Sequence, residues 1–372
     1  MKIYLVGGAV RDEILGALIK DRDWVVVDSS PEEMIEAGFK QVGADFPVFL
    51  HPETGEEYAL ARVERKTGDG YHGFTVDTKG VTIEDDLSRR DLTINSMARE
   101  WTPEGLGPII DPFKGQSDLQ YKELRHTSDA FIEDPLRVVR LARFAARYSE
   151  FCIAPETERL AIKMIKEGHL DHIPYERYWA EMQKVMVDQY GDPGRFFQLL
   201  FSWGVRENVQ FFHDVFGGPP KYESHSNCIY RTANITKTHV KEDLRLSVLV
   251  AIVGRQDFLP IMGSSTEMVK LHANLWAARK AGDISNPTQR AEATFELMKI
   301  AKPWGEGPHY DNLVTATRVI EMNAVPALCS HRLEVLRLAI NQVKAEQFPH
   351  LQGKELGQAI EAARRKAVET TL

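Results

Sequence analysis

Residues 7–23 read GGAVRDEILGALIKDRD and join two apolar runs, Ile3–Val6 and Trp24–Val27. Short apolar runs bounded by glycine or by charged residues are typical of buried strands. Glycines let the backbone approach another group closely, and a helix that begins directly after them can offer its N-terminus to phosphate. The stretch therefore predicts a strand, a glycine turn, a helix and a second strand, arranged around an anion site.

Two carboxylates, Asp21 and Asp23, stand at the start of the second predicted strand, where alternate residues share a face. Two carboxylates beside a phosphate site can hold Mg²⁺ that bridges the phosphates of a nucleotide. A D-x-D pattern alone is more often a pair of solvated charges at a strand end. Combined with the glycine turn at this spacing, it predicts a metal-dependent nucleotide site.

A second charged motif, RRDLTIN, covers residues 89–95. The guanidinium fork of arginine fits phosphate oxygens, so Arg90 is a candidate phosphate ligand, and Asn95 can reach a ribose hydroxyl. The alternative is an exposed helical turn whose arginines pair with the acidic residues 84–86. That alternative explains Arg89 well and the whole motif poorly.

A third motif, EDPLRVVRLARFAAR, covers residues 133–147. At helical spacing, one carboxylate and several arginines share a face opposite a face of valine and alanine. Such a face can present donors and acceptors to a base edge while it neutralises phosphates. The alternative is that Asp134 merely caps the helix ahead of Pro135 and that the basic face is solvated. The polar face comprises Asp134, Arg137, Arg140, Arg143 and Arg147.

The remaining sequence predicts an α+β protein whose second part is helical. Further strands are expected at Val48–Leu50 and Glu57–Ala61, and a helix with a capping box begins at Ser30. Residues 61–71, ARVERKTGDGY, are charged and then glycine-rich, which predicts a mobile loop. From about residue 129 the pattern is helical almost to the end, with breaks at residues 191–194, 217–220 and 302–303.

Composition limits the classes of function without selecting one. With 43% hydrophobic and 27% charged residues, the 372-residue chain reads as an ordinary globular protein of two or three domains. A net charge of −8 argues against indiscriminate coating of nucleic acid, but it leaves room for a local basic stripe. We expect no signal peptide, no membrane span and, from three widely spaced cysteines without metal-type spacing, a reducing cytoplasm.

The four segments at residues 7–23, 61–71, 89–95 and 133–147, in this order, resemble the class II tRNA nucleotidyltransferases, the family of the bacterial CCA-adding enzymes. The resemblance is close over residues 1–150, weaker through the helical region to about residue 205, and poor afterwards. It implies an α+β fold with a polymerase-β-like palm, a mixed sheet with helices, in a nucleotidyltransferase head at residues 1–128. A helical neck for nucleotide selection (residues 129–205) and a helical body and tail for tRNA binding (residues 206–372) would follow.

The resemblance also implies roles for single residues. Two carboxylates would bind the catalytic Mg²⁺ ions, and Asp111 to Leu119 would form a hinge-like element between head and neck. The nucleotide-binding residues would contact the triphosphate, its sugar and the Watson–Crick edge of C or A. The metal ligands would be Asp21 and Asp23, and the nucleotide-binding residues would be Gly8, Arg11, Arg90, Asn95, Asp134, Arg137 and Arg140.

The implied activity is template-independent addition of CCA to the 3′ end of tRNA from CTP and ATP, with release of pyrophosphate. The partners would be tRNA, ATP and CTP, with no membrane and no DNA. Bacterial poly(A) polymerase and partial enzymes that add only CC or only A remain alternatives. The acidic balance and the expected lack of an N-terminal extension and a basic C-terminal tail disfavour the first, and the charged loop segment disfavours a CC-only enzyme.

Three further interpretations are disfavoured. Glycines 7 and 8 lack the G-x-G-x-x-G spacing of a dinucleotide fold, and retention of both aspartates argues against a non-catalytic RNA-binding module. Many long relatives carry a metal-dependent HD phosphohydrolase domain, but here Ala251 and Ile252 stand where its His-Asp pair would lie, and Arg231-Thr232 stands where His-Thr is expected. Alanine and isoleucine offer no metal-binding atoms, so we expect that the hydrolase is lost.

Overall fold

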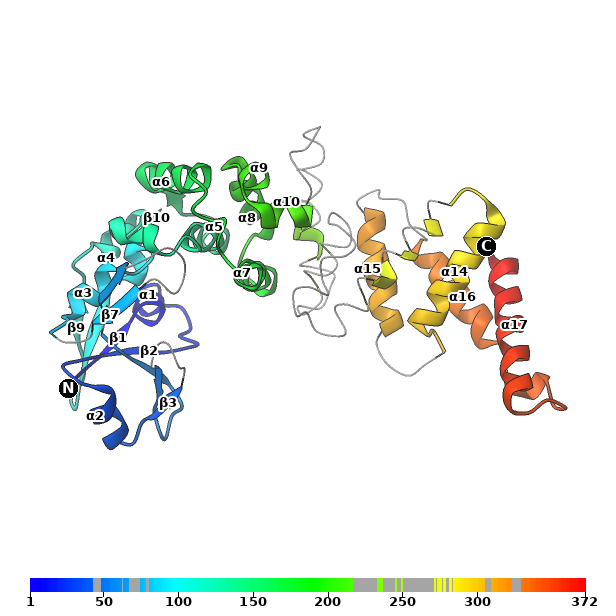
Figure 1. Cartoon of the computed structure of the whole chain (residues 1–372), viewed down its shortest axis with the longest axis horizontal. Helices are drawn as coiled ribbons and strands as arrows, with labels where there is room; N and C mark the ends of the chain where they lie inside the picture. The colour runs from blue at the N-terminus through cyan, green and yellow to red at the C-terminus, as the bar shows by residue number, and fades with distance from the viewer. Residues whose placement is uncertain are drawn as a thin grey trace. The chain divides into compact units, whose positions relative to one another are not determined.

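The computed structural model describes residues 1–42, 48–61, 63–66, 74–77, 80–216, 284–304, 309–322 and 329–372, with short helical pieces between 233 and 282 (Figure 1). The chain divides into two compact units, Met1–Ile173 and Pro174–Leu372. The segments 217–232 and 250–270 lie outside the described residues. The interpretation of Ala251, Ile252 and Arg231-Thr232 as remnants of a hydrolase therefore stays a prediction.

The first unit is built on a mixed sheet of seven strands in the order β3-β4-β5-β2-β1-β8-β9. All neighbours are antiparallel except β2 and β5, which are parallel. The four strands expected from apolar runs are confirmed, and the sheet adds β3, β8 and β9. The strand bounds are β1 (Lys2–Val6), β2 (Asp23–Val27), β3 (Lys40–Val42), β4 (Val48–Leu50), β5 (Glu57–Leu60), β8 (Ala98–Thr102) and β9 (Gly105–Ile110).

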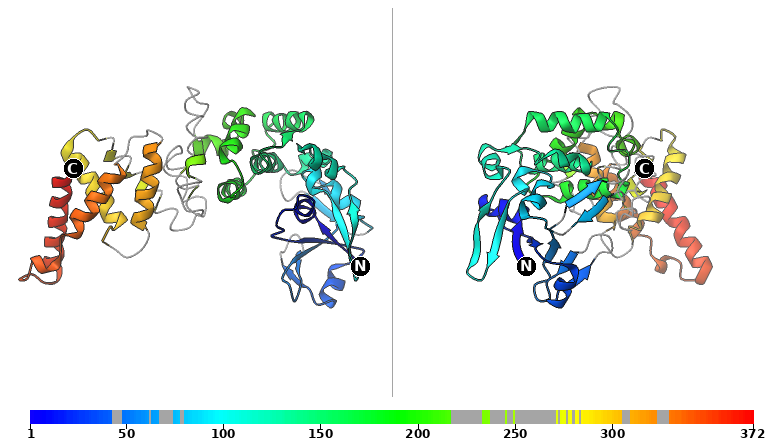
Figure 2. Two further views of the ribbon diagram at one scale, coloured as in Figure 1. Left: turned by 180° about the vertical axis from the view of Figure 1, so that it is seen from behind. Right: turned by 60° about the vertical axis from the view of Figure 1, so that its left-hand side comes forward.

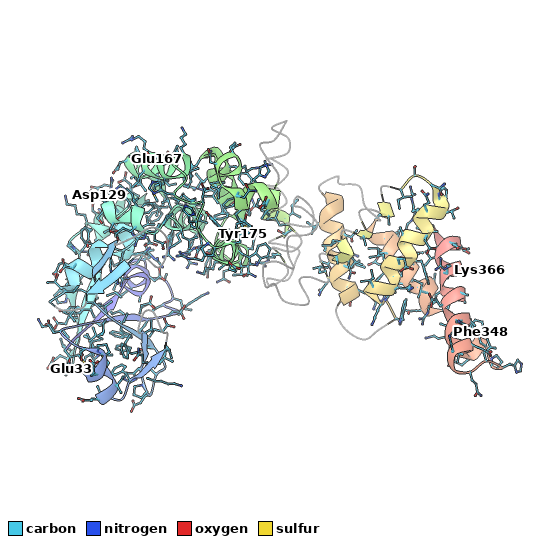
Figure 3. The ribbon with its side chains drawn as sticks, in the orientation of Figure 1. Glu33, Asp129, Glu167, Tyr175, Phe348 and Lys366 are labelled. Atoms are coloured by element: carbon cyan, nitrogen blue, oxygen red, sulfur yellow. The ribbon has the colours of Figure 1, made fainter. Side chains whose placement is uncertain are left out.

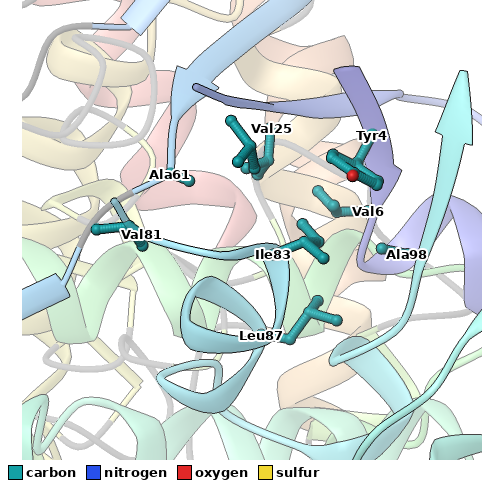
Figure 4. Close-up of a cluster of buried hydrophobic side chains, with 9 residues drawn as sticks. Tyr4, Val6, Val25, Ala61, Val81, Ile83, Leu87 and Ala98 are labelled. Atoms are coloured by element: carbon teal, nitrogen blue, oxygen red, sulfur yellow. The ribbon is translucent and has the colours of Figure 1, made fainter. Parts of the chain in front are cut away.

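One face of the sheet is covered by α3 (Ile83–Ser88). Figure 4 shows Ile83 and Leu87 of this helix against Tyr4 and Val6 of β1 and Val25 of β2. Leu87 and Val6 are fully buried, because the alternating side chains of β1 and β2 that point to this face meet the apolar side of one short helix. This core fixes the sheet edge from which the glycine turn emerges.

Short helices connect the strands of the first unit. The capping box predicted at Ser30 is present: the Ser30 hydroxyl accepts from the Glu33 amide, and the Glu33 carboxylate accepts from the Ser30 amide. Two-residue strands β10 (Glu123–Leu124) and β11 (Cys152–Ile153) pair in parallel. The helices are α1 (Gly8–Ile14), α2 (Pro31–Glu36), α4 (Gly115–Tyr121), α5 (Arg137–Arg147) and α6 (Pro155–Lys166), with 3-10 turns η1 (Thr93–Asn95) and η2 (Asp129–Glu133).

The expectation of a loop over residues 61–71 is wrong in part. Val63–Lys66 form a strand, β6, that pairs antiparallel with β7 (Phe74–Asp77). Backbone hydrogen bonds between the two segments form this ribbon, and they do not depend on the apolar run that the sequence lacks. Residues 67–73 between the two strands lie outside the described residues.

The second unit is helical throughout its described residues, as predicted. Its N-terminal helices share an aromatic core in which Tyr178 stacks on Phe211 at 4.7 Å between ring centroids. The helices α14 to α17 pack against one another (Figure 2), and Figure 3 shows Lys366 and Phe348 near the end of the chain. The bounds are α7 (Tyr175–Val187), α8 (Pro193–Ser202), α9 (Val205–Asn208), α10 (Gln210–Phe216), α14 (Pro287–Ala301), α15 (His309–Met322), α16 (Ser330–Asn341), η5 (Ala345–Gln347) and α17 (Gly353–Thr371).

The predicted helix breaks at residues 191–194 and 302–303 are confirmed. The Asp192 side chain caps α8 by accepting from the Arg195 amide, and Pro193 occupies the first turn. Lys302 adopts a left-handed conformation that ends α14. In the part of the chain that the structure describes, no helix is both long and apolar enough to span a bilayer.

Candidate active site

The glycine turn and the second motif meet at Gly7. This residue precedes α1 and has φ +71°, a backbone conformation that residues other than glycine rarely adopt. A Cβ atom at Gly7 would lie 2.9 Å from Nη1 of Arg90. The guanidinium of Arg90 therefore packs against the backbone of the glycine turn. Two motifs, represented by Gly7 and Arg90 83 residues apart, thus lie side by side.

Arg11 is buried, with 7% of its surface exposed, and connects all three motifs. Its Nη1 donates to Oδ1 of Asn95 at 2.6 Å, and its Nε donates to Oδ1 of Asp12 at 2.8 Å. Its guanidinium carbon lies 5.7 Å from the ring centroid of Phe144 and 5.4 Å from that of Tyr148. Those two rings belong to α5 and the residue after it, so Arg11 joins the glycine turn to the third motif.

Asp91 is the carboxylate at which the second and third motifs join. Oδ1 accepts from Nδ2 of Asn95 at 3.0 Å and from the Leu92 amide at 2.8 Å. Oδ2 accepts from Nε and Nη2 of Arg140 at 2.9 and 2.6 Å. Burial alone would raise the pKa of Asp91, but Arg140 and the hydrogen bonds from Asn95 and Leu92 hold it well below its ordinary value.

The arginines of the second motif also rest on a buried carboxylate. Asp86 is fully buried and accepts from Nη2 of Arg89 at 2.5 Å and from Nη2 of Arg90 at 3.2 Å. Burial would raise the pKa of Asp86, but Arg90 and Arg89 lower it below the ordinary value. Pairing of these arginines with the acidic segment is thus real, yet it orients Arg90 toward Gly7 rather than leaving the motif as an exposed turn.

The third motif forms α5 with the predicted division into two faces. Seven residues of the helix are buried, whereas its arginines are half-buried. Arg137 donates to the backbone carbonyls of Ala130 and Arg89, and burial lowers the pKa of its guanidinium while Asp134 opposes that shift. The buried residues are Val138, Val139, Leu141, Ala142, Phe144, Ala145 and Ala146.

Asp134 lies just ahead of this helix and makes a local cap-like bond. Its Oδ1 accepts from the Leu136 amide at 3.2 Å, and its backbone carbonyl accepts from the Arg137 amide at 3.0 Å. The helix itself begins at Arg137, so Asp134 stabilises the turn before the helix rather than capping its first turn. The two interpretations of Asp134, as a local cap and as a base reader, are compatible with this geometry.

The segment Asp111 to Leu119 packs under the second motif. Both carboxylate oxygens of Asp111 accept backbone amides at the start of α4, from Gly115 and Gln116. A Cβ atom at Gly115 would lie 2.3 Å from the Thr93 carbonyl, so only glycine allows α4 to approach η1 this closely. Asp118 then accepts from the Thr93 hydroxyl at 2.6 Å. The element predicted as a hinge thus supports the turn that carries Asn95.

Asp21 and Asp23 are both exposed. Asp23 is the first residue of β2 and is in register with Val6 of β1 and Glu57 of β5, which places it beside the end of the strand that leads into the glycine turn. Asp21 precedes the strand, so the expectation that both aspartates start it holds only for Asp23.

The donor set at these aspartates suits a hard divalent cation. Among the described residues no group of three or more histidine, cysteine, aspartate or glutamate side chains is placed to hold a metal ion. A site with two carboxylates agrees with the coordination preference of Mg²⁺. Proteins usually bind Mg²⁺ through one or two carboxylates together with substrate phosphates rather than through protein ligands alone. The residues present therefore fit a metal ion that binds with a nucleotide.

Sequence reasoning assigned no role to Asp91 or Asp12, which organise the site, and named Asp86 only as one of the acidic partners in an exposed helical turn. The signal available for Asp91 was its position four residues before Asn95, which allows a side-chain contact within one turn. Its partner Arg140 is 49 residues away, and no spacing rule could connect the two. Phe144 and Tyr148, to which sequence reasoning also gave no role, receive the guanidinium of Arg11.

Comparisons with known proteins agree on one family. The sequence profile of the poly A polymerase head domain matches residues 3–125. The CCA-adding enzyme of Marinobacter nauticus is 41% identical over 375 residues, which cover 98% of this chain and 97% of that protein. The multifunctional CCA protein of Paraburkholderia phymatum is 53% identical over 224 residues, so the match spans 59% of this chain and about half (53%) of that relative. A solved structure of a CCA-adding enzyme in its apo form II shares the fold, with TM-score 0.66, 21% identity, and coverage of 99% of this chain and 88% of that one.

Proposed function

Since this chain belongs to the family of the CCA-adding enzymes, which are tRNA nucleotidyltransferases, we propose that it adds C, C and A to the 3′ end of tRNA from CTP and ATP. The observation that carries the proposal is the convergence of three motifs in one unit. Arg90 lies against Gly7, Arg11 donates to Asn95, and Asp91 accepts from Arg140. Together they offer a phosphate site, a sugar site and a helix that can read a base.

In the proposed reaction the 3′-hydroxyl oxygen of the tRNA bonds to the α-phosphorus of the nucleotide. The bond from that phosphorus to the β-phosphate oxygen breaks, pyrophosphate leaves and the hydroxyl proton is released. A divalent cation such as Mg²⁺, when bound by Asp21 and Asp23, supplies Lewis-acid stabilisation of phosphate charge. Arg90, oriented by Asp86 against the glycine turn, neutralises the triphosphate. Gly8, which has no side chain, lets the triphosphate approach the backbone.

The remaining residues hold the sugar and select the base. Arg11 is engaged by Asp12 and Asn95, so its contribution includes holding the Asn95 amide for the ribose. Asp134 and Arg137, with Arg140 beside them, present acceptors and donors to the Watson–Crick edge of C or A. A site built for those hydrogen bonds rejects a base that leaves them unpaired, because unpaired buried polar groups are costly.

We further propose that residues 1–128 act as the nucleotidyltransferase head, residues 129–205 as the neck and residues 206–372 as the tRNA-binding body and tail. The boundary between the two compact units after Ile173 falls inside the proposed neck. A tRNA-processing role would place the protein in the cytoplasm, with neither a membrane nor DNA as a partner.

The runner-up is a poly(A) polymerase, because the head profile that matches carries that description. Similarity to a CCA-adding enzyme over 98% of the chain favours CCA addition. The test is incubation of the purified protein and Mg²⁺ with tRNA that lacks CCA, with each nucleotide singly and in pairs. The proposal expects two additions with CTP alone and three with CTP and ATP. Long A tracts on any RNA primer would support the polymerase, and a stop after CC with both nucleotides would support a partial enzyme.

A further inference from the structure

A closed circuit of side chains ties α5 to the glycine turn. Arg140 of α5 donates to Asp91, and Asp91 accepts from Asn95. Asn95 in turn accepts from Arg11, and the guanidinium of Arg11 lies over the rings of Phe144 and Tyr148. This series of contacts therefore starts at Arg140 and ends at Phe144, about one helical turn further along α5.

We propose that Asp91 is a positioning residue for nucleotide selection, which acts through Arg140 and Asn95 to fix α5 against the glycine turn. The inference rests on the proposed function, because it needs α5 to read the base and the glycine turn to hold the triphosphate. Asp91 then sets the distance between these two parts of the site.

The hydrogen-bonding capacity of Asp91 supports positioning rather than ligand binding. An ionised carboxylate has about four lone-pair sites. Here four donors reach the two oxygens: the Leu92 amide, the Asn95 amide group and two nitrogens of Arg140. Only 7% of the surface of Asp91 is exposed, and its carboxylate oxygens accept hydrogen bonds from donors of its own chain.

A shift at Arg140 would be passed to the base-reading residues. Arg137 precedes Arg140 by three residues, which places both on the same helical face. Arg137 is itself held by the carbonyls of Ala130 and Arg89, the second of which belongs to the motif of Asp91. Loss of the Asp91 carboxylate therefore removes the two hydrogen bonds that it accepts from Arg140 and lets the start of α5 move relative to the second motif.

Asp118 offers a matched control in the same unit. It is a buried carboxylate with 6% of its surface exposed, and it also supports η1, by accepting from the Thr93 hydroxyl. Its arginine partner is Arg125, which lies outside α5 and outside the glycine turn. Asp118→Asn should therefore destabilise the unit as Asp91→Asn does and, by loosening the turn that carries Asn95, raise KM for all four nucleotides alike, but it leaves the hydrogen bonds from Arg140 to Asp91 and should not release α5.

The experiment measures kcat and KM for CTP, ATP, UTP and GTP on tRNA acceptors, together with thermal melts, for the full-length chain and the two variants. Discrimination is the ratio of kcat/KM for CTP or ATP to kcat/KM for UTP or GTP. Asp91→Asn should remain folded, and this ratio should fall by about ten- to one hundred-fold. Asp118→Asn should melt lower and keep its discrimination. Unchanged discrimination in Asp91→Asn, or an equal loss in Asp118→Asn, would overturn the inference.

A second variant keeps the test decisive if Asp91→Asn does not fold. Asp91→Glu retains the negative charge opposite Arg140 but adds one methylene, so it should fold better and still relax discrimination by displacing Arg140. Unchanged discrimination in Asp91→Glu would also overturn the inference. Failure of the wild-type protein to add C or A at all would instead remove the proposed function, which separates the two failures.

Discussion

Replacement of Gly7 by alanine should impair nucleotide use more than it impairs folding. The backbone at Gly7 has φ +71° and ψ −128°, and holding an alanine there costs about 1–3 kcal/mol. The added Cβ would lie 2.9 Å from Nη1 of Arg90, which is closer than real contacts allow. Because that atom ends a flexible side chain, Arg90 can swing away, and the steric part of the stability cost stays small.

The functional loss follows from that movement of Arg90. Its guanidinium would leave the glycine turn and weaken its hydrogen bonds to Asp86, which are 3.2 and 3.3 Å long. A hydrogen bond between charged groups is worth about 1.5–3 kcal/mol, so loss of one from Arg90 to the triphosphate should raise KM for CTP by about ten- to one hundred-fold.

The assay compares Gly7→Ala with Gly38→Ala by steady-state kinetics on tRNA lacking CCA and by thermal melts. Gly38 follows α2 with φ +90°, and an added Cβ there would meet nothing within 4 Å. Both variants should lose stability, by about 1–3 kcal/mol for Gly7→Ala and about 1–2 kcal/mol for Gly38→Ala, but only Gly7→Ala should raise KM. Equal KM values in the two variants would refute the assignment of Arg90 to phosphate binding at the glycine turn.

Three further predictions concern stability in acid, base choice and the β6–β7 ribbon. Because Arg140 holds the pKa of Asp91 below its ordinary value, the stability from this pair is complete above about pH 4 and is lost as the pH falls through the lowered pKa. Below about pH 4, the denaturant midpoint should therefore depend less on pH in Asp91→Asn than in the wild type. Equal slopes of midpoint against pH in the two proteins would contradict this. Asp134→Asn should keep its melting temperature, since the side-chain oxygen of asparagine can accept from the same Leu136 amide. It should relax selection among the four nucleotides by about ten- to one hundred-fold, and unchanged selection would leave only the local bond. Deletion of residues 64–69 should leave CC addition measurable and suppress A addition in a gel assay, whereas equal loss of both would indicate a general structural role for the ribbon.

The sequence predicts those parts of the fold that local patterns determine. β1, β2, β4 and β5 follow from apolar runs, and the capping box at Ser30 follows from two side chains within one turn. β8 was missed because Arg99 and Glu100 interrupt its apolar pattern. Arg99 donates to the carbonyls of Leu106 and Gly107 in β9, so tertiary contacts satisfy a charge that local reasoning counts against a strand.

The residues of the candidate site also divide into those that local patterns predict and those that only the fold explains. Arg90 and Asn95 could be named because their motif carries the chemistry of phosphate and sugar binding, and the polar face of α5 follows from helical spacing. Asp86 could be named only as one of several acidic partners of the arginines, and Asp91 could not be named, because its importance lies in burial and in a partner, Arg140, that the fold supplies. The ribbon at residues 63–66 was missed because its pairing needs a second segment, which sequence reasoning did not connect to it.

The proposed function requires Asp21 and Asp23 to bind the metal ion with which this chain would transfer nucleotides to tRNA. The most direct test measures incorporation of labelled CTP and ATP into tRNA lacking CCA at saturating Mg²⁺, for the wild-type chain, Asp21→Asn, Asp23→Asn and Glu36→Gln, an exposed carboxylate on α2 that serves as the control. We expect three added nucleotides for the wild type and for Glu36→Gln, and no addition by either aspartate variant, with unchanged melting temperatures throughout. Near-normal turnover in Asp21→Asn or Asp23→Asn would contradict this expectation.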